Sequence, residues 1–217
     1  MAGLIADPFR SARLVLHLRQ EGVPDDGVLQ AMETIDRAAF VDDPALTLLA
    51  FENALLPIPC GQIIPQPVTT GQLIQALQLK RGRESRVLLI GAGSGYTAAL
   101  LSQLASDVFA VERYHVLTEA IRRRIVDLGL SNLAVRCEDG LLGWPERGPY
   151  DRILLAGAVT EIPEALMAQL GKGGILVAPV VTPEGQVLMR LHETGERERL
   201  GFRHALPLLR EGRSQAL

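Results

Sequence analysis

The sequence predicts an α/β fold: an open, mostly parallel sheet with helices on both faces and a C-terminal antiparallel hairpin. The first observation is the stretch 87–96, where four apolar residues run into a turn with three glycines and a helical pattern follows. The second is the alternation of apolar runs with helical patterns over residues 86–180. The third is a pair of strand-like runs at 186–191 and 203–209, separated by a charged turn.

Composition is typical of one globular domain. The chain has 217 residues, of which 47% are hydrophobic and 22% charged, and this is enough for an α/β domain with a sizeable core. We expect a single domain over 1–217, with N-terminal helices and a proline-rich substrate loop in 1–80 and the α/β sheet in 81–217. The formal net charge of -3 gives no reason to expect nucleic-acid binding.

The location of the protein is also predicted from the sequence. No apolar run reaches the length of a membrane span, and the N-terminus lacks the pattern of a signal peptide, so we expect no membrane association. Cys60 and Cys137 form no metal-ligand cluster. We therefore expect reduced thiols, a cytoplasmic location and no metal.

The sequence of the N-terminal third predicts helices followed by an irregular segment. Helices are expected over 13–20 and from Asp25 or Asp26, either of which can cap the second helix, to 35. Residues 52–72 contain four prolines together with Gly61 in an ordered segment that should not form a strand. This segment is either a rigid connector or a substrate loop. Thr69 or Thr70 then caps a helix that continues to residue 77.

Regular alternation begins after Arg86. Further helices are expected over residues 96–104, 115–128 and 163–170. Strands are expected over residues 86–90, 107–112, 132–137, 150–156, 175–180, 186–191 and 203–209.

The glycine turn indicates the kind of ligand. Tyr96 occupies the position of the third glycine in a dinucleotide fingerprint, so the pattern G-x-G-x-G favours an S-adenosylmethionine (SAM) site over a dehydrogenase. Glu112 ends the next strand, about 20 residues later, where a carboxylate can accept both ribose hydroxyls. Asp139 can accept the adenine amino group, and Gly140 leaves room for the ring. The predicted cofactor residues are Gly91, Ala92, Gly93, Ser94, Gly95, Glu112, Asp139 and Gly140.

From about Leu14 to its end, the chain resembles the protein-L-isoaspartate O-methyltransferase family. In the C-terminal half, the resemblance rests on motifs that follow one another in the family's order: VLLIGAGSGY at 87–96, AVER at 110–113, EDG at 138–140, PYD at 149–151 and AGA at 156–158. In the N-terminal half it rests on residues 37–41, 56–58 and 61–62.

The resemblance implies a Rossmann-like SAM-dependent methyltransferase fold and a carboxyl methyltransferase activity. The substrate would be a peptide or protein that carries L-isoaspartate, and the products would be a methyl ester, from which repair can proceed, and S-adenosyl-L-homocysteine (SAH). A carboxylate is already ionised near neutral pH, so no general base is expected. The protein has mainly to align the reactants and limit water.

One departure from the family pattern affects the substrate loop. The family usually has G-Q-T-I-S-(Q/A)-P, whereas residues 61–67 are GQIIPQP, so Pro65 replaces the serine whose hydroxyl is associated with the reacting carboxylate. Proline has neither a hydroxyl nor an N–H. We assign no catalytic residue; Thr69, Thr70 or a backbone amide is the expected substitute for the missing hydroxyl. The predicted substrate-binding residues are Gln62, Ile63, Ile64, Pro65, Gln66 and Leu206.

Three functions follow from this departure. In the first, methylation of L-isoaspartyl carboxylates survives. In the second, the chain is a SAM-binding paralogue with a changed carboxylate acceptor, on a peptide or a small molecule. In the third, it is a non-catalytic SAM-binding protein. Glu112 and Asp139 favour SAM binding in all three, and the oligomeric state stays open.

Overall fold

The computed structural model describes residues 9–80, 82–202 and 204–214. Its α-helices are α1 Arg10–Gln20, α2 Asp26–Thr34, α3 Pro67–Ala76, α4 Tyr96–Leu104, α5 His115–Asp127 and α6 Glu164–Met167. Its strands are β1 Leu56–Ile58, β2 Gln62–Ile64, β3 Arg86–Ile90, β4 Asp107–Glu112, β5 Leu133–Cys137, β6 Tyr150–Leu155, β7 Leu170–Thr182, β8 Gly185–His192 and β9 Arg197–Leu200. Short 3-10 helices are η1 Arg37–Phe40, η2 Pro44–Phe51, η3 Pro59–Gly61, η4 Gly140–Leu142 and η5 Pro145–Arg147.

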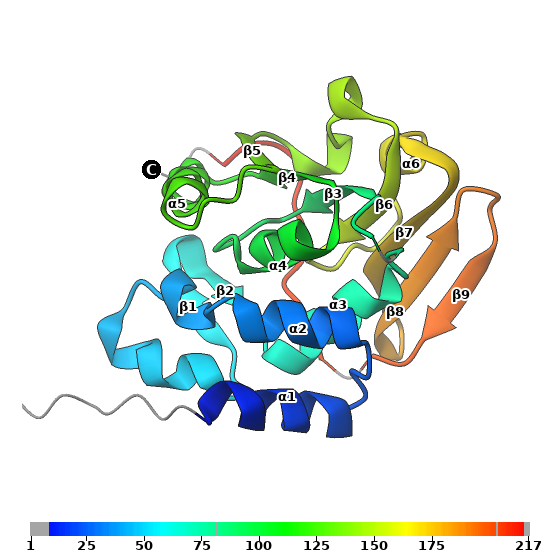
Figure 1. Cartoon of the computed structure of the whole chain (residues 1–217). Coiled ribbons are helices and arrows are strands. Elements are labelled where there is room, and N and C mark those ends of the chain that lie inside the picture. The colour runs from blue at the N-terminus through cyan, green and yellow to red at the C-terminus, as the bar shows by residue number, and fades with distance from the viewer. Residues whose placement is uncertain (1–8, 81, 203, 215–217) are drawn as a thin grey trace, which may run out of the picture.

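The main sheet has seven strands in the order β5-β4-β3-β6-β7-β8-β9. The pairs from β5 to β7 are parallel, and β8 and β9 add antiparallel strands at one edge (Figure 1). The predicted fold class, with its C-terminal antiparallel hairpin, is therefore confirmed. Strand β4, which follows β3 in the chain, lies on one side of β3, and β6 lies on the other side, so the strand order reverses at β3. Ligands bind at such a reversal, beyond the carboxyl ends of the strands.

Alternate residues of β3 face two separate cores. Val87 and Leu89 belong to a cluster with the N-terminal helices, α4 and α5, whereas Leu88 and Ile90 belong to a second cluster that includes Leu166 of α6. Helices thus cover both faces, as predicted. The first cluster joins buried residues from α1 to the C-terminal segment. The division into 1–80 and 81–217 stays a prediction.

The N-terminal helices lie together against one face of the sheet, with α2 packed on α4 (Figure 1). Asp25 caps α2 as predicted, because its carboxylate accepts from Val28 N at 3.0 Å. Helix α3 begins earlier than expected. Its first residue is Pro67 rather than a residue after Thr69, because proline suits the first helical position, where no N–H is needed.

The proline-rich segment is more regular than the sequence indicated. Strands β1 and β2 form an antiparallel hairpin in which Pro57 lies opposite Ile63. The expectation of no strand here was wrong. The hairpin turns at Cys60 and Gly61, with φ of 63° and 64°, and cysteine is a rare residue for a left-handed turn position. The usual turn signal is therefore missing, and an isolated two-stranded sheet tolerates the proline.

The C-terminal hairpin pairs different residues from those predicted. The partner of β8 is β9, Arg197–Leu200, which the sequence assigned to a charged turn. Charged residues are common on edge strands, and here Glu198 accepts from Arg190 of β8 at 2.7 Å. Residues 204–209 lie elsewhere: Leu208 forms a parallel bridge with Ala158, after β6. Residue 203 lies outside the described residues.

The helix predicted over 163–170 is also shorter than expected. Helix α6 ends at Met167, and Leu170 already pairs with Tyr150 as the first residue of β7. The end of the predicted helix therefore begins β7 instead, because Leu170 pairs with β6. None of the helices in the described part of the chain combines the length and the apolar character needed to cross a bilayer.

Candidate active site

A pocket opens at the carboxyl edge of the parallel strands and contains about 900 Å³, including the space at its mouth. Four parts of the chain line it: the loop around β2, the glycine turn with α4, the ends of the strands, and the C-terminal segment. The lining residues are Gln62, Ile63, Ile64, Pro65, Ile90, Gly91, Ala92, Gly93, Ser94, Tyr96, Thr97, Val111, Glu112, Arg113, Tyr114, Gly140, Leu141, Ala156, Gly157, Pro207, Leu208, Leu209 and Arg210.

The glycine turn requires its glycines for conformation and for space. Gly93 and Gly95 have φ of 57° and 89°, a region that other residues rarely adopt. A side chain at Gly95 would come within 3.0 Å of Ile121 of α5, whereas one at Gly93 would make ordinary contacts with Ile58 Cδ1 at 3.7 Å and the Ile63 carbonyl at 3.9 Å. The turn therefore lies next to the β2 loop, which lines the same pocket.

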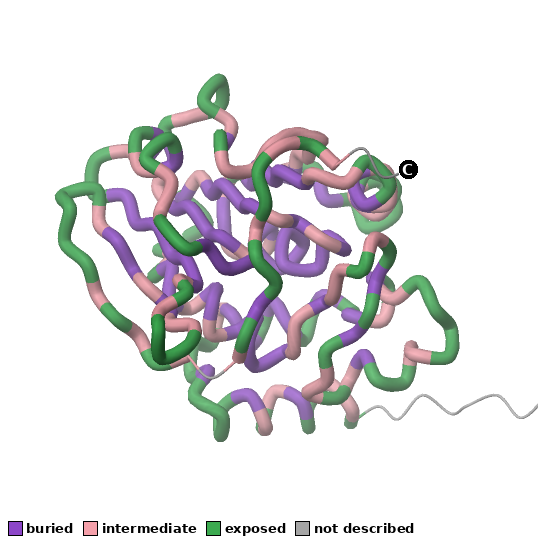
Figure 2. The backbone as a smooth tube through the Cα atoms, turned by 180° about the vertical axis from the view of Figure 1, so that it is seen from behind, coloured by how far each residue is buried: buried purple, intermediate pink, exposed green. Residues whose placement is uncertain are grey.

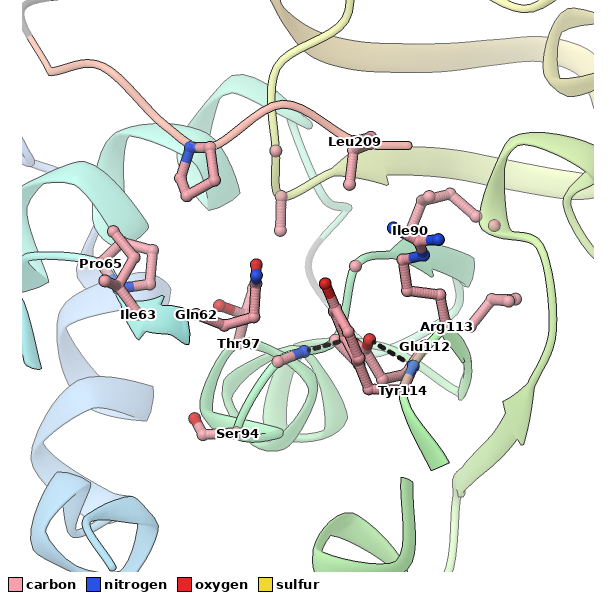
Figure 3. A pocket seen from close by; sticks show the side chains of 18 of the residues that line it. Gln62, Ile63, Pro65, Ile90, Ser94, Thr97, Glu112, Arg113, Tyr114 and Leu209 are labelled. Carbon is pink, nitrogen blue, oxygen red and sulfur yellow. Dashed lines mark hydrogen bonds between the residues drawn. The ribbon is translucent and has the colours of Figure 1, made fainter. Parts of the chain in front are cut away.

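Glu112 lies at the centre of this site. Its side chain is buried, and its Oε2 accepts from Gly93 N at 2.8 Å while its Oε1 accepts from Tyr114 N at 3.0 Å (dashed lines in Figure 3). Burial raises the pKa of this carboxyl, and the backbone hydrogen bonds oppose that shift. The carboxylate is therefore fixed in place, and each oxygen has a further lone pair for a ribose hydroxyl.

Asp139 is held by two backbone groups. Its Oδ1 accepts from Leu141 N at 2.9 Å, and its Oδ2 accepts from Gly212 N at 2.7 Å. Arg113 fixes the same C-terminal segment, because its Nε donates to Gly212 O at 3.1 Å. Asp139 itself is not among the residues that line the pocket. Its role as the acceptor for adenine stays a prediction.

The C-terminal segment is a mostly exposed strip (Figure 2), and its residues 207–210 line the pocket. It approaches the backbone after β6 closely: Ala158 N donates to Pro207 O at 2.9 Å, and Leu209 N donates to Ala158 O at 2.8 Å. A side chain at Gly157 would come within 2.8 Å of Leu209. Glycine at 157 thus allows Pro207 and Leu209 to form one wall of the pocket.

The opposite wall is the substrate loop, and one buried arginine holds it. Arg37 is 3% exposed, and its guanidinium donates to the carbonyl of Pro65 at 3.0 Å and to that of Ala54 at 2.7 Å. It also donates to Ala50 O at 3.2 Å, and its Cζ lies 5.9 Å from the centre of the Tyr96 ring. Burial lowers the pKa of Arg37 to about 10, so the group stays charged at neutral pH.

Most of the predicted site residues come together in this pocket. Those that line it are Gln62, Ile63, Ile64, Pro65, Gly91, Ala92, Gly93, Ser94, Glu112 and Gly140. Gly95 lies just behind the lining as the N-cap of α4, and Gln66 is the N-cap of α3.

Three residues are placed differently from the expectation. Leu206 is 5% exposed and belongs to the apolar core, so the substrate wall starts one residue later, at Pro207. Thr69 and Thr70 are 1% and 0% exposed and do not line the pocket, since they lie inside α3. Neither hydroxyl is therefore available to replace the serine of the loop.

Sequence reasoning missed several lining residues. Arg113 and Tyr114 directly follow Glu112, so the rule that places Glu112 at the end of its strand could have found them. Thr97 is the second residue of α4, and no sequence pattern distinguished its hydroxyl. Leu209 and Arg210 line the pocket because tertiary contacts bring the C-terminal segment to it, and no local sequence pattern indicates this.

The family model of protein-L-isoaspartate(D-aspartate) O-methyltransferases matches residues 9–203. The chain belongs to this family. Its curated relatives include protein-L-isoaspartate O-methyltransferases from Yersinia enterocolitica and Yersinia pestis. Each is 47% identical over 171 residues, which is 79% of this chain and 81% of the relative.

Solved structures support the same family. A protein-L-isoaspartate O-methyltransferase superposes with a TM-score of 0.78 and 27% identity, over 88% of this chain and 64% of that one. A Plasmodium falciparum protein assigned to the same class and solved with SAH has a TM-score of 0.76 and 22% identity, over 91% and 97% of the two chains. The second match supports the fold alone.

Proposed function

We propose that this chain transfers the methyl group of SAM to the carboxylate of L-isoaspartyl residues in damaged proteins. The observation that carries the proposal is one pocket that combines the glycine turn and Glu112 with the substrate loop at Gln62–Pro65. Family membership supports SAM as the methyl donor and a protein as the substrate.

The chain's own residues have to position and shield rather than to move protons. When bound, SAM supplies an electrophilic methyl group; an acceptor carboxylate oxygen forms the new C–O bond as the C–S bond breaks, which leaves a methyl ester and SAH. The acceptor is already ionised near neutral pH. Glu112 would hold the ribose, and the apolar wall of Ile63, Ile64 and Pro65 would limit water around the reacting atoms.

The first prediction concerns the acceptor. With labelled SAM, we expect wild-type protein to methylate an isoaspartyl peptide and not its normal aspartyl twin. We expect Pro65→Ser to raise kcat/KM for the isoaspartyl peptide by about tenfold, because a hydroxyl adds one hydrogen bond to a charged group. Pro183→Ser makes the same chemical change in the turn between β7 and β8 and should leave the rate unchanged.

Equal labelling of both peptides would contradict isoaspartyl specificity. If SAM binds but neither wild type nor Pro65→Ser labels the isoaspartyl peptide, the proposed acceptor is wrong. The search then moves to other carboxylates, or to a binding protein without transfer activity.

A second prediction concerns pH. Both oxygens of Glu112 can accept ribose hydroxyls only while the carboxyl is deprotonated. Because burial raises the pKa of this carboxyl, its protonation starts at a higher pH than that of an exposed glutamate. We expect SAM affinity to fall as the pH is lowered from about 7 to about 5. Glu112→Gln should bind more weakly at about pH 7 and vary less over this range. Calorimetric titration of both proteins tests this, and an equal pH dependence would exclude Glu112 as the titrating group.

Cys60 and Cys137 form no disulfide, and the cytoplasmic location proposed from them remains a prediction. The expectation that nucleic acid is not a partner likewise rests on the net charge of -3.

A further inference from the structure

The substrate wall of the pocket is poor in hydrogen-bond donors. Pro65 has no N–H, and its carbonyl accepts from Arg37 at 3.0 Å. Ile63 and Ile64 contribute apolar side chains, and the Gln62 side-chain amide donates to Cys60 O at 3.2 Å. The side chains of this wall therefore offer few donors to an acceptor carboxylate that lies against it.

Thr97, in the first turn of α4, supplies a hydroxyl on the adjoining side. The residue is 7% exposed and lines the pocket. Figure 3 shows Thr97 beside Gln62, on the side of the pocket toward Pro65, with Glu112 and Tyr114 farther along. Arg37 links the two sides, because it binds the Pro65 carbonyl and lies 5.9 Å from the ring of Tyr96, the residue before Thr97.

The Thr97 hydroxyl lines the pocket without a hydrogen-bond partner among the described residues. In the described part of the chain Thr70 Oγ1 and Tyr96 Oη have no partner either, but both atoms are fully enclosed. Three other helical hydroxyls are paired. Thr118 and Thr34 each donate to the carbonyl four residues earlier, at 3.0 Å and 2.8 Å, and Ser102 donates to Ala99 O at 2.7 Å. Within residues 9–80, 82–202 and 204–214, no group hydrogen bonds to Thr97 Oγ1. Buried hydroxyls normally have a partner, so the partner of this one is expected to come from the pocket.

The position also suits an anion. Thr97 lies at the N-terminus of a nine-residue helix, where the helix dipole favours negative charge. Ser94, the other hydroxyl near this end, lies apart from Thr97 and Gln62 in Figure 3. Thr97 is therefore the better placed donor for a carboxylate.

We propose that the Thr97 hydroxyl donates a hydrogen bond to the carboxylate of the acceptor, in place of the hydroxyl that Pro65 removes from the substrate loop. This assignment rests on the proposed function, because it takes the acceptor to be a carboxylate. It makes Thr97 an acceptor-binding residue that holds one carboxylate oxygen while the other faces the methyl group.

The test measures binding and turnover separately. Binding of a fluorescent isoaspartyl peptide to the SAH complex is measured by anisotropy, and SAM and SAH affinities are measured by calorimetry. We expect Thr97→Val to weaken peptide binding by about tenfold, with SAM and SAH affinities unchanged. Thr97→Ser keeps the hydroxyl and should bind the peptide within about twofold of wild type. Thr118→Val removes a buried hydroxyl outside the pocket and serves as the control.

Each outcome separates this inference from the proposed function. If wild type methylates the peptide and Thr97→Val binds it as well as wild type, the Thr97 assignment is overturned and the function stands. If Thr97→Val weakens SAM instead, the hydroxyl serves the methyl donor and the assignment is again overturned. If wild type binds the peptide without turnover and Thr97→Val loses binding, the Thr97 assignment is supported and the activity is not. If wild type neither binds nor methylates the peptide, both are overturned.

Discussion

Replacing Glu112 with alanine is expected to weaken SAM binding by about ten- to a hundredfold. The carboxylate is the predicted acceptor for the ribose hydroxyls, and hydrogen bonds to a charged group contribute about 1.5–3 kcal/mol each. The change also leaves Gly93 N and Tyr114 N without their acceptor, so the glycine turn loses one of its hydrogen bonds to β4. Calorimetric titration with SAM measures the loss directly.

Glu119→Ala is the matched control. Glu119 lies on α5, and its carboxylate pairs with Arg122 at 2.5 Å on the exposed side of that helix. We expect its removal to leave SAM affinity within about twofold of wild type. Unchanged SAM affinity in Glu112→Ala itself would mean that the ribose lies elsewhere in the pocket.

Replacing Arg37 with methionine is expected to lower the free energy of unfolding by about 3 kcal/mol or more, because each buried carbonyl left without a donor costs about 1–3 kcal/mol. The carbonyls of Ala50, Ala54 and Pro65 all lose a donor in this variant. Since Pro65 is one of them, the substrate loop should also become less ordered. Urea unfolding gives the stability, and the KM for the acceptor reports on the loop.

Two variants make the Arg37 prediction specific. Arg19→Met removes an arginine from an exposed ion pair with Asp26 and should change stability by less than about 1 kcal/mol. Arg37→Lys keeps the charge but lacks the planar guanidinium that spans several carbonyls, so we expect an intermediate loss. If Arg37→Met is as stable as Arg19→Met, then Arg37 does not hold the substrate loop.

Local sequence patterns predicted the central part of the fold well. Strands β3 and β4 and helix α4 begin and end at the predicted residues, because apolar runs and a glycine turn define those boundaries within a few residues. The cap of α2 at Asp25 is equally local. The same reasoning placed Glu112 at the end of its strand, where it lines the pocket.

The C-terminal part shows where local patterns fail. Charge made residues 197–200 look like a turn, although they form β9 through cross-strand ion pairs. An apolar composition made 203–209 look like the last strand, although residues 207–209 line the pocket and Leu208 pairs with Ala158. Edge strands and crossing segments depend on which neighbour is available, and composition does not contain that information.

The sequence by itself determined the family and the methyl donor, because the motifs behind both depend on residue identity at fixed spacing. Only the tertiary structure decided which side chains line the pocket. Thr69, Thr70 and Leu206 do not line it, and Thr97 does. The contacts responsible join residues far apart in the chain: Arg37 and Pro65 are 28 residues apart, and Asp139 and Gly212 are 73 apart. No local periodicity encodes such pairs, since they form only when separate elements pack together.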